Sequence, residues 1–380
     1  MRILFLFISF PVMFYCSSAP ERVSTMDSAP EYLIEVDREY PVMNYYIEEI
    51  ILLEMTPESA VGKGEKILEY KGHYYILDYL MHDVKKFDAA GQYVSTYDFK
   101  GRGAHEYLTL SDIQINPWAE TLDILDPRGK IVRHRLNSKS STRFLDDIRF
   151  PDMRQVSHFA WIDANRMILN SVNLPFLIRF FDMEADKVVK TTVKSNLVRV
   201  GFTPIFYNSP FLYLEDQMFY INYFKSDVFE VEIDDLNSSF SFYFGENNFE
   251  FEELGEIDEQ FDFNQYRRDH HKVFPTYNVF LNQDYIGIGV RYQDAIHHFI
   301  RRVSDGQTFR LNFPAYFENF MDFQAFANGL HKDHFRGFIK NPAEVKNILA
   351  DAKNKDEYKD LLDRVDPEDN PLIVRYRLEE

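Results

Sequence analysis

The sequence predicts an all-β fold, a six-bladed β-propeller built from four-stranded antiparallel blades. The 380 residues include 36 Phe and 24 Tyr against 2 Trp, and Phe and Tyr favour strands. Four short apolar segments separated by turn residues follow one another within residues 66–113. The second segment of such a group ends at Asp78, Asp126, Asn170 and Asn222, so the group recurs about every 48 residues. A repeat of this length and content is typical of propeller blades.

Residues 66–113 contain the clearest blade and the connection into the next one. Its strands are predicted at Lys66–Tyr70, His73–Asp78, Asp83–Asp88 and Gln92–Phe99. Turn residues separate these strands at 71–72, 80–82 and 89–91. A four-stranded antiparallel meander cannot bury both of its faces alone, so copies of it must pack on either side.

The later segments follow the same order with less regular spacing. Blade 2 is predicted at 111–116, 121–126, 130–136 and 142–150, blade 3 at 158–164, 166–171, 176–182 and 187–193, blade 4 at 211–216, 218–222, 228–234 and 238–244, and blade 5 at 276–282, 285–290, 297–303 and 307–313. Blade 6 supplies only three strands, at 321–328, 334–340 and 372–378. The apolar run Tyr45–Met55 is the remaining strand, and we expect this N-terminal strand to complete blade 6 and close the ring.

The first 16 residues have the features of a secretory signal peptide of the lipoprotein type. Arg2 precedes the apolar stretch Ile3–Tyr15, which is too short to span a bilayer, since about 20 apolar residues are needed. Cys16 follows directly and is the only cysteine, so the chain forms no internal disulfide. We expect cleavage before Cys16 and acylation of its thiol; plain cleavage nearby and an uncleaved anchor are the alternatives. Residues 17–32 are predicted to be a flexible tether, and residues 33–380 the propeller.

Two segments interrupt the regular pattern of the blades. Residues 246–269 are strongly acidic with interspersed Phe. They either bind Ca²⁺ through oxygen ligands or form a solvated, mobile loop, and they lack the regular Asp/Asn order of a dedicated calcium loop. Residues 342–369 carry apolar positions at helical spacing and predict a helical insertion in the last blade, packed across one face of the ring. Its charged positions form an ordinary solvated face or a surface that docks a partner.

The charge balance excludes one class of partner. The chain has 42 Lys and Arg against 61 Asp and Glu, a net charge of −19. A nucleic-acid-binding protein needs a basic footprint, which this sequence lacks, and an anionic membrane surface would repel the chain. The excess of negative charge favours solubility, and cation binding is the alternative.

Several segments together resemble a known family. They are ESAVGKGEKILEYKGHYYILD, VKKFDAAGQYV, GRGAHEYLTLSDIQIN and, at the C-terminus, NPLIVRYRL. In this combination and order they resemble a family of bacterial six-bladed β-propeller lipoproteins, related in architecture to NHL-type propellers and common in Gram-negative anaerobes that degrade glycans. The family usually has Pro-Gly where this chain has Ala104-His105. The resemblance implies a propeller fold and an outer-envelope location, and it supplies no catalytic residues because the family has no agreed activity.

The segment Lys100–Tyr107 is the first candidate site. It leaves one blade and enters the next, and Gly101 and Gly103 allow backbone conformations that other residues resist. Arg102, His105 and Glu106 bring polar groups to the rim of the ring. These residues either hold neighbouring blades together or contact a ligand.

The histidines are the second candidate site. His270-His271 and His297-His298 are doublets, and adjacent residues on a strand point to opposite faces, so each doublet offers at most one metal ligand per face. His331 and His334 lie in a predicted turn. None of these pairs has the spacing of a zinc site, so no metal is predicted; His270 and His271 remain candidate ligand-binding residues.

The sequence carries no nucleophile elbow, phosphate loop or dinucleotide fingerprint. We therefore expect a non-catalytic, lipid-anchored module at the outer membrane, on its periplasmic or surface side, that binds a glycan, a peptide or an envelope protein. The alternatives are an envelope lyase or hydrolase with a His/carboxylate site in the central channel, and a purely structural spacer. Catalytic sites assembled from several blades leave no local motif, so an enzyme stays possible at this stage.

Overall fold

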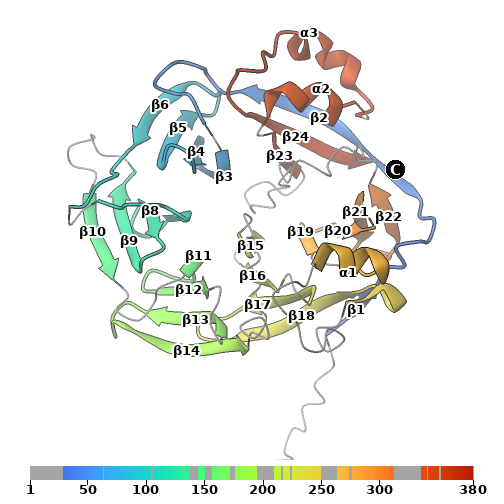
Figure 1. Cartoon of the computed structure of the whole chain (residues 1–380), viewed down its shortest axis with the longest axis horizontal. Helices are drawn as coiled ribbons and strands as arrows, with labels where there is room; N and C mark the ends of the chain where they lie inside the picture. Colours follow the sequence, from blue (N-terminus) through green and yellow to red (C-terminus); the bar gives the residue numbers. More distant parts are fainter. Residues whose placement is uncertain are drawn as a thin grey trace, which may run out of the picture.

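The computed structural model describes residues 29–62, 64–103, 106–136, 144–149, 156–171, 176–194, 209–214, 217–222, 225–249, 263–273, 276–293, 295–311, 335–339, 341–350 and 352–379. Strands dominate this part of the chain and form five hydrogen-bonded sheets arranged in a ring (Figure 1). The helices are few and short. The predicted propeller of antiparallel blades is thus confirmed in its architecture.

Four of the sheets contain a four-stranded antiparallel meander in chain order, as predicted. Meander 1 consists of β3 Gly64–Tyr70, β4 His73–Asp78, β5 Asp83–Asp88 and β6 Tyr93–Tyr97, and meander 2 of β7 Asp112–Asn116, β8 Thr121–Asp126, β9 Lys130–Arg135 and β10 Phe144–Arg149. Meander 3 consists of β11 Val156–Trp161, β12 Arg166–Ser171, β13 Phe176–Asp182 and β14 Lys187–Lys194, and meander 4 of β15 Phe211–Leu214, β16 Gln217–Asn222, β17 Asp227–Val231 and β18 Leu236–Tyr243. The short strand β1 Glu31–Leu33 is added to meander 4, parallel to β18.

The remaining strands form one seven-stranded sheet, so the predicted count of six separate blades is not confirmed. The order in this sheet is β19 Thr276–Leu281, β20 Tyr285–Tyr292, β21 Ala295–Arg302, β22 Thr308–Leu311, β2 Val42–Leu52, β24 Leu372–Glu379 and β23 Phe335–Ile339. The expected pairing of the N-terminal and C-terminal strands is present, antiparallel between β2 and β24. However, β2 begins three residues earlier than predicted, and Val42 and Met43 pair in parallel with β22. Hydrogen bonds on both sides of β2 therefore merge the two strand groups, and the predicted strand 321–328 lies outside the described residues.

The N-terminal segment 31–43, here called the strap, runs along the outer edge of two neighbouring sheets. Ile34 and Val36 are buried in a cluster with residues of meander 4 and of β19–β21. The Tyr292 hydroxyl donates a hydrogen bond to the Asp37 carboxylate at 2.8 Å. Residues 31 and 32, predicted to end the tether, therefore belong to a strand, while residues 1–28, including Cys16, lie outside the described residues.

The hydrophobic core is divided into six clusters among the described residues, each between neighbouring groups of strands. One cluster joins meanders 1 and 2 through Leu77 and Ile113. Another joins β23 and β24 to meander 1 through Phe338 and Ile76. Burial between adjacent sheets is thus the main force that stacks them around the ring.

Buried polar contacts also connect the sheets. The Asp112 carboxylate of β7 accepts a hydrogen bond from Lys66 Nζ of β3 at 2.6 Å and from the Phe159 amide of β11 at 3.0 Å. Trp161 Nε1 of β11 donates to Asp123 of β8 at 2.8 Å. The Asp112 carboxylate, on the innermost strand of meander 2, thereby bonds to the meander on either side, meanders 1 and 3.

The predicted helical insertion 342–369 is a set of short helical turns. It contains 3₁₀ turns at Pro342–Glu344 and Lys355–Tyr358 and the helices α2 Val345–Ile348 and α3 Lys359–Leu362. The apolar residues Val345, Leu349, Ala352 and Leu362 pack in one cluster with β2 and β24. The apolar spacing correctly indicated helical structure, but the chain bends between turns to cover the closing strands.

The acidic segment 246–269 is partly described. Residues 250–262 lie outside the described residues, so the predicted calcium site there stays a prediction. The end of the segment forms a helix, α1 Phe263–Asp269, rather than a loop.

Candidate functional site

The loop 99–108 connects meander 1 to meander 2 and folds around the Glu106 side chain. The Gly103 amide donates a hydrogen bond to Glu106 Oε2 at 2.7 Å. A Cβ atom on Gly101 would overlap the Glu106 carboxylate. Neither glycine has a positive φ, so the sequence-based reason for them was wrong. The Glu106 carboxylate occupies the space that a side chain at position 101 would need, so it would have to move if Gly101 were replaced.

Contacts from both meanders fix this loop. Lys130 Nζ at the start of β9 donates to the Glu106 carbonyl oxygen. The Leu108 amide donates to Asp126 Oδ2 at 3.1 Å. The Tyr107 hydroxyl donates to the His82 carbonyl oxygen of meander 1 at 2.9 Å. These contacts hold the described residues of the loop between meanders 1 and 2, and the two roles predicted for Glu106, holding blades together or contacting a ligand, stay predictions.

Asp78 and Asp126 end the second strands of meanders 1 and 2 and have equivalent roles. Asp78 accepts hydrogen bonds from the Leu80 and Met81 amides of its own turn and from the Gly62 amide of the preceding segment. Asp126 likewise accepts hydrogen bonds from the Arg128 amide of its own turn and from the Leu108 amide of the preceding loop. Both aspartates therefore stabilise the turn that follows their strand.

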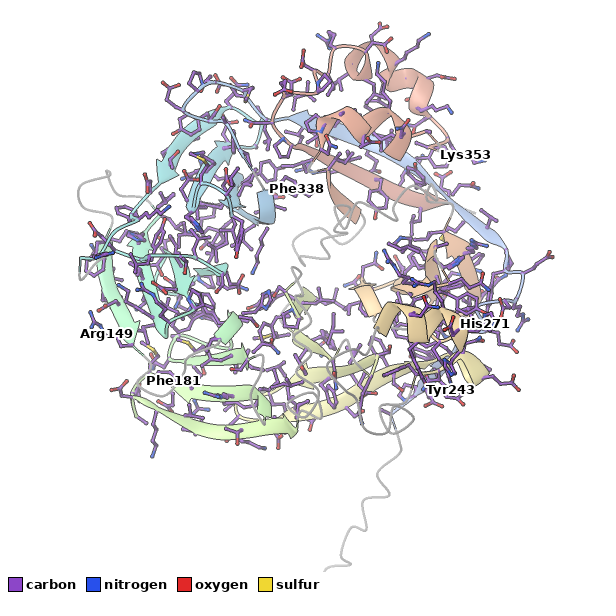
Figure 2. All side chains as sticks on the ribbon, in the orientation of Figure 1. Arg149, Phe181, Tyr243, His271, Phe338 and Lys353 are labelled. Atoms are coloured by element: carbon purple, nitrogen blue, oxygen red, sulfur yellow. The ribbon has the colours of Figure 1, made fainter. Side chains whose placement is uncertain are left out.

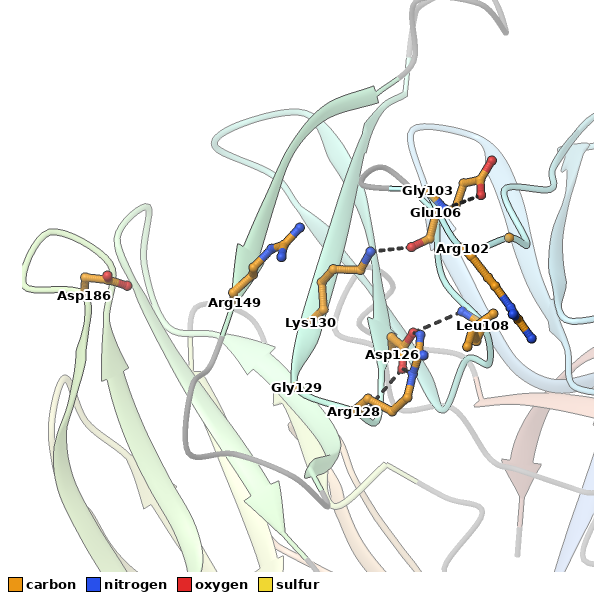
Figure 3. Close-up of a pocket in the computed structure, with 11 residues that line it drawn as sticks. Arg102, Gly103, Glu106, Leu108, Asp126, Arg128, Gly129, Lys130, Arg149 and Asp186 are labelled. Atoms are coloured by element: carbon orange, nitrogen blue, oxygen red, sulfur yellow. Dashed lines mark hydrogen bonds and ion pairs between the residues drawn. The ribbon is translucent and has the colours of Figure 1, made fainter.

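Between the loop and the neighbouring turn of meander 2 lies a groove with a volume of about 940 Å³ (Figure 3). We call it the Arg102 groove. It is lined by Gly101, Arg102, Gly103, Glu106 and Leu108 of the loop, by Asp126, Arg128, Gly129 and Lys130 of the turn between β8 and β9, and by Arg149 and Asp186.

Glu106 and Asp126 are engaged by other groups of the protein, whereas Arg102 is exposed and has no hydrogen bond or ion pair within the described part of the chain. Burial raises the pKa of Asp126, but hydrogen bonds from Arg128 and from the Leu108 amide outweigh this effect and hold the pKa below its ordinary value. Burial lowers the pKa of Lys130, and Asp147 and Asp126 offset this only in part. Among the cations of the groove, Arg128, Lys130 and Arg149 have partners within the protein, and Arg102 has none in the described residues.

The structure brings only some of the predicted site residues together. Arg102 and Glu106 line the groove, while His105 lies outside the described residues. His271 and Arg149 lie on opposite sides of the ring in Figure 2. His270 and His271 follow α1 as exposed turn residues, and the His270 ring stacks on Tyr266 at 4.1 Å. They do not belong to the groove.

Sequence analysis missed Arg128, Lys130 and Arg149. Two of them flank Gly129 in the turn between β8 and β9, and Arg149 ends β10. In a meander, the turn after the second strand and the exit of the fourth strand lie at the same end of the blade. The charged segment Asp126–Lys130 was therefore a usable signal, because that geometry places it at the same rim as the loop.

Among the described residues, no group of three or more His, Cys, Asp or Glu side chains is placed to hold a metal ion. His297 Nδ1 lies 2.9 Å from the Arg310 guanidinium, and burial lowers the pKa of His298 to about 4. His331 and His334 lie outside the described residues. In the described ranges no helix is long and apolar enough to cross a bilayer.

The innermost strands carry the residues nearest to the predicted channel site of an enzyme. Lys66, Asp112 and His158 are nearly inaccessible, and Asp112 is engaged by Lys66 and by backbone amides. Burial lowers the pKa of His158 to about 4. These contacts suit a structural role between sheets.

Solved structures similar to this one include two bacterial proteins and a more distant domain from Neurospora crassa. A protein described as exported, from Bacteroides fragilis NCTC 9343, has 14% sequence identity and a TM-score of 0.73, covering 93% of this chain and 100% of the other. A member of the DUF4221 family from Bacteroides vulgatus has 8% identity and a TM-score of 0.53, covering 89% and 99%. The Neurospora crassa Pan2 WD40 domain is more distant, with 8% identity and a TM-score of 0.37 over 70% of this chain and 71% of the other.

The comparison with curated proteins finds no match. The comparison with family models matches residues 48–377, from β2 to β24, to a domain of unknown function, DUF4934. This match includes all the meanders and the Arg102 groove. The chain therefore belongs to the DUF4934 family.

Proposed function

We propose that this chain is an exported, lipid-anchored β-propeller of the bacterial envelope that acts as a non-catalytic binding module through the Arg102 groove. The groove carries the proposal, because loops of two meanders build it and its volume is about 940 Å³. Ligand pockets typically measure about 300–1,000 Å³. Hydrogen bonds from both meanders also hold the described residues of its loop, and such preorganisation lowers the entropic cost of binding.

The envelope location is supported by the apolar N-terminal stretch with the single Cys16 and by the similar protein from Bacteroides fragilis that is described as exported. Fractionation of cells that express the full chain tests it. The chain should be recovered with the membranes and incorporate a labelled fatty acid, and Cys16→Ser should abolish both. If the wild-type chain incorporates no labelled fatty acid, it carries no lipid anchor and this part of the proposal is wrong.

We also infer that the ring has six blades, with the seven-stranded sheet counted as two. Six hydrophobic clusters between strand groups support this inference. The pairing of β2 with β22 involves two residues, against eight with β24. An experimental map in which β22 and β24 belong to one evenly paired sheet would contradict it.

Blocking the groove tests the binding function. The chain from residue 29 onward has no cysteine, so Arg149→Cys can be labelled selectively with a bulky maleimide. Glycans and peptides are first screened by thermal shift, since a ligand at 100 times its Kd stabilises by about 2.7 kcal/mol. Val303→Cys, an exposed position on the other side of the ring, is the matched labelling control.

We expect at least one stabilising ligand whose effect is lost when the label is at position 149 and kept when it is at position 303. The Arg149→Cys variant without the label shows the effect of losing one charge alone, and its comparison with the labelled variant gives the effect of blocking the groove. Ligand binding that survives the label at position 149 excludes the groove as the site. A screen in which no glycan and no peptide stabilises the protein counts against a ligand-binding module.

A further inference from the structure

The sign of the charge changes at the Arg102 groove. The whole chain has a net charge of −19. The groove is lined by four cationic residues, Arg102, Arg128, Lys130 and Arg149, and by three carboxylates. A locally positive groove on an acidic protein selects for anions, because the rest of the surface repels them.

Within the described residues, none of the carboxylates of the groove forms an ion pair with Arg102. Glu106 accepts the hydrogen bond of the Gly103 amide, and Asp126 is occupied by Arg128 and by the Leu108 amide. The Arg149 guanidinium bonds Asp147 through Nε at 3.0 Å. Arg102 projects from a loop whose glycines and glutamate fix its backbone, and it has no ion pair within the described residues. An exposed guanidinium without an ion pair in the described part of the chain is available to bind a carboxylate or sulfate group in a bidentate manner.

Most side chains of the lining residues are charged. Leu108 is the single apolar side chain among the lining residues, and three of the others are glycines that expose backbone groups. Peptide ligands usually need pockets for apolar side chains, whereas saccharides bond to polar side chains and backbone groups. The groove therefore fits a hydroxyl-rich ligand better than a peptide.

We propose that the Arg102 groove binds an acidic saccharide, with Arg102 pairing with a carboxylate or sulfate group and with Lys130 and Arg149 at its flanks. This inference rests on the proposed binding function and names its ligand class.

Titration calorimetry with four probes of equal length tests it: a uronate oligosaccharide, a sulfated oligosaccharide, a neutral glucan and a polyglutamate peptide. The two acidic saccharides separate carboxylate from sulfate recognition. The variants are Arg102→Gln and the matched control Arg364→Gln, an exposed arginine of the helical insertion. We expect at least one acidic saccharide to bind, with affinity falling as salt is raised, and Arg102→Gln to weaken it about tenfold or more. Arg364→Gln should have no effect.

Three results would overturn the inference, and they also separate it from the proposed function. Neutral glucan that binds as tightly as the acidic saccharides, and is blocked by the label at position 149, refutes acidic recognition but keeps the groove as a binding site. Polyglutamate that binds in place of the saccharides makes the ligand an acidic protein segment. Acidic saccharides that bind equally well to Arg102→Gln and to the protein labelled at position 149 place binding elsewhere and refute both.

Discussion

At the residue scale, burial shifts the pKa of two histidines and one aspartate. It lowers the pKa of His158 and of His298 to about 4; near His158, Asp112 raises the pKa without cancelling this effect, and Lys66 lowers it further. Burial raises the pKa of Asp123 to about 6, with Arg133 and the Trp161 hydrogen bond opposing it. These groups therefore link the stability of the ring to pH.

We predict that the free energy of unfolding decreases as the pH falls from about 6.5 to about 4. Above the pKa that it has in the unfolded chain, each histidine is neutral in the folded and in the unfolded state. Below that pKa the unfolded chain binds a proton at this histidine and the folded chain does not. Each histidine can lower the free energy of unfolding by at most roughly 3 kcal/mol over this pH range. Asp123 acts in the opposite direction, because its protonated form is favoured in the folded protein. The net effect is still a loss of stability, since two histidines act against one aspartate.

Urea denaturation at pH 7.5 and pH 4.5 measures this dependence. His298→Gln should reduce the difference between the two pH values, and His270→Gln, an exposed residue, should leave it unchanged. Equal pH dependence in wild type and His298→Gln would show that the buried imidazole is not a source of the acid sensitivity.

At the scale of elements, one asparagine connects the helical insertion to the closing strand. The pairing of β2 with β24 shifts register between Ile47 and Glu49. Asn354 supplies partners at this bulge, since its side chain accepts from the Ile47 amide at 2.8 Å and donates to the Ile47 carbonyl oxygen at 2.7 Å. The Tyr358 hydroxyl donates to the Glu48 carbonyl oxygen at 2.7 Å. The insertion therefore stabilises the point where the two chain ends meet.

Asn354→Ala is expected to lower the free energy of unfolding by about 1–3 kcal/mol, because two half-buried backbone groups lose their partners. Asn347→Ala removes an exposed contact to Glu344 in the same insertion and should have little effect. Chemical denaturation of the two variants beside wild type gives the comparison. Equal stability of the two variants would mean that water replaces Asn354 at the bulge without cost.

At the scale of the whole molecule, the strap and β2 close the ring. Together they cover the outer edges of β18 and β22 and pair along β24. They also contribute Ile34, Val36, Met43 and Tyr45 to two hydrophobic clusters. Unpaired strand edges next to exposed apolar surface promote association between chains.

A chain that begins at residue 57 should therefore lose its cooperative thermal transition and form oligomers. A chain that begins at residue 29 keeps β1 and β2 and is the matched control. Light scattering after size exclusion, together with thermal denaturation, distinguishes the two. A monomeric shorter chain with an unchanged Tm would show that the ring does not depend on its N-terminal closure.

Local patterns in the sequence were sufficient to predict most of the strands and turns and the pairing of the two chain ends. Alternating apolar residues, turn residues and the aspartates at the ends of second strands are local signals, so His73–Asp78, Thr121–Asp126 and Arg166–Ser171 were predicted to the residue. It also identified Arg102 and Glu106, because a charged, glycine-containing loop between two blades is visible in the chain.

How those parts meet depends on contacts between residues far apart in the chain. The place of Glu106 beneath its own loop, and the presence of Arg102, Arg128, Lys130 and Arg149 around one groove, follow from the way in which the meanders stack. The merging of two strand groups depends on hydrogen bonds from both sides of one strand, β2. Such contacts join residues distant in the chain, and their energies depend on packing between sheets, which no local pattern of residues encodes.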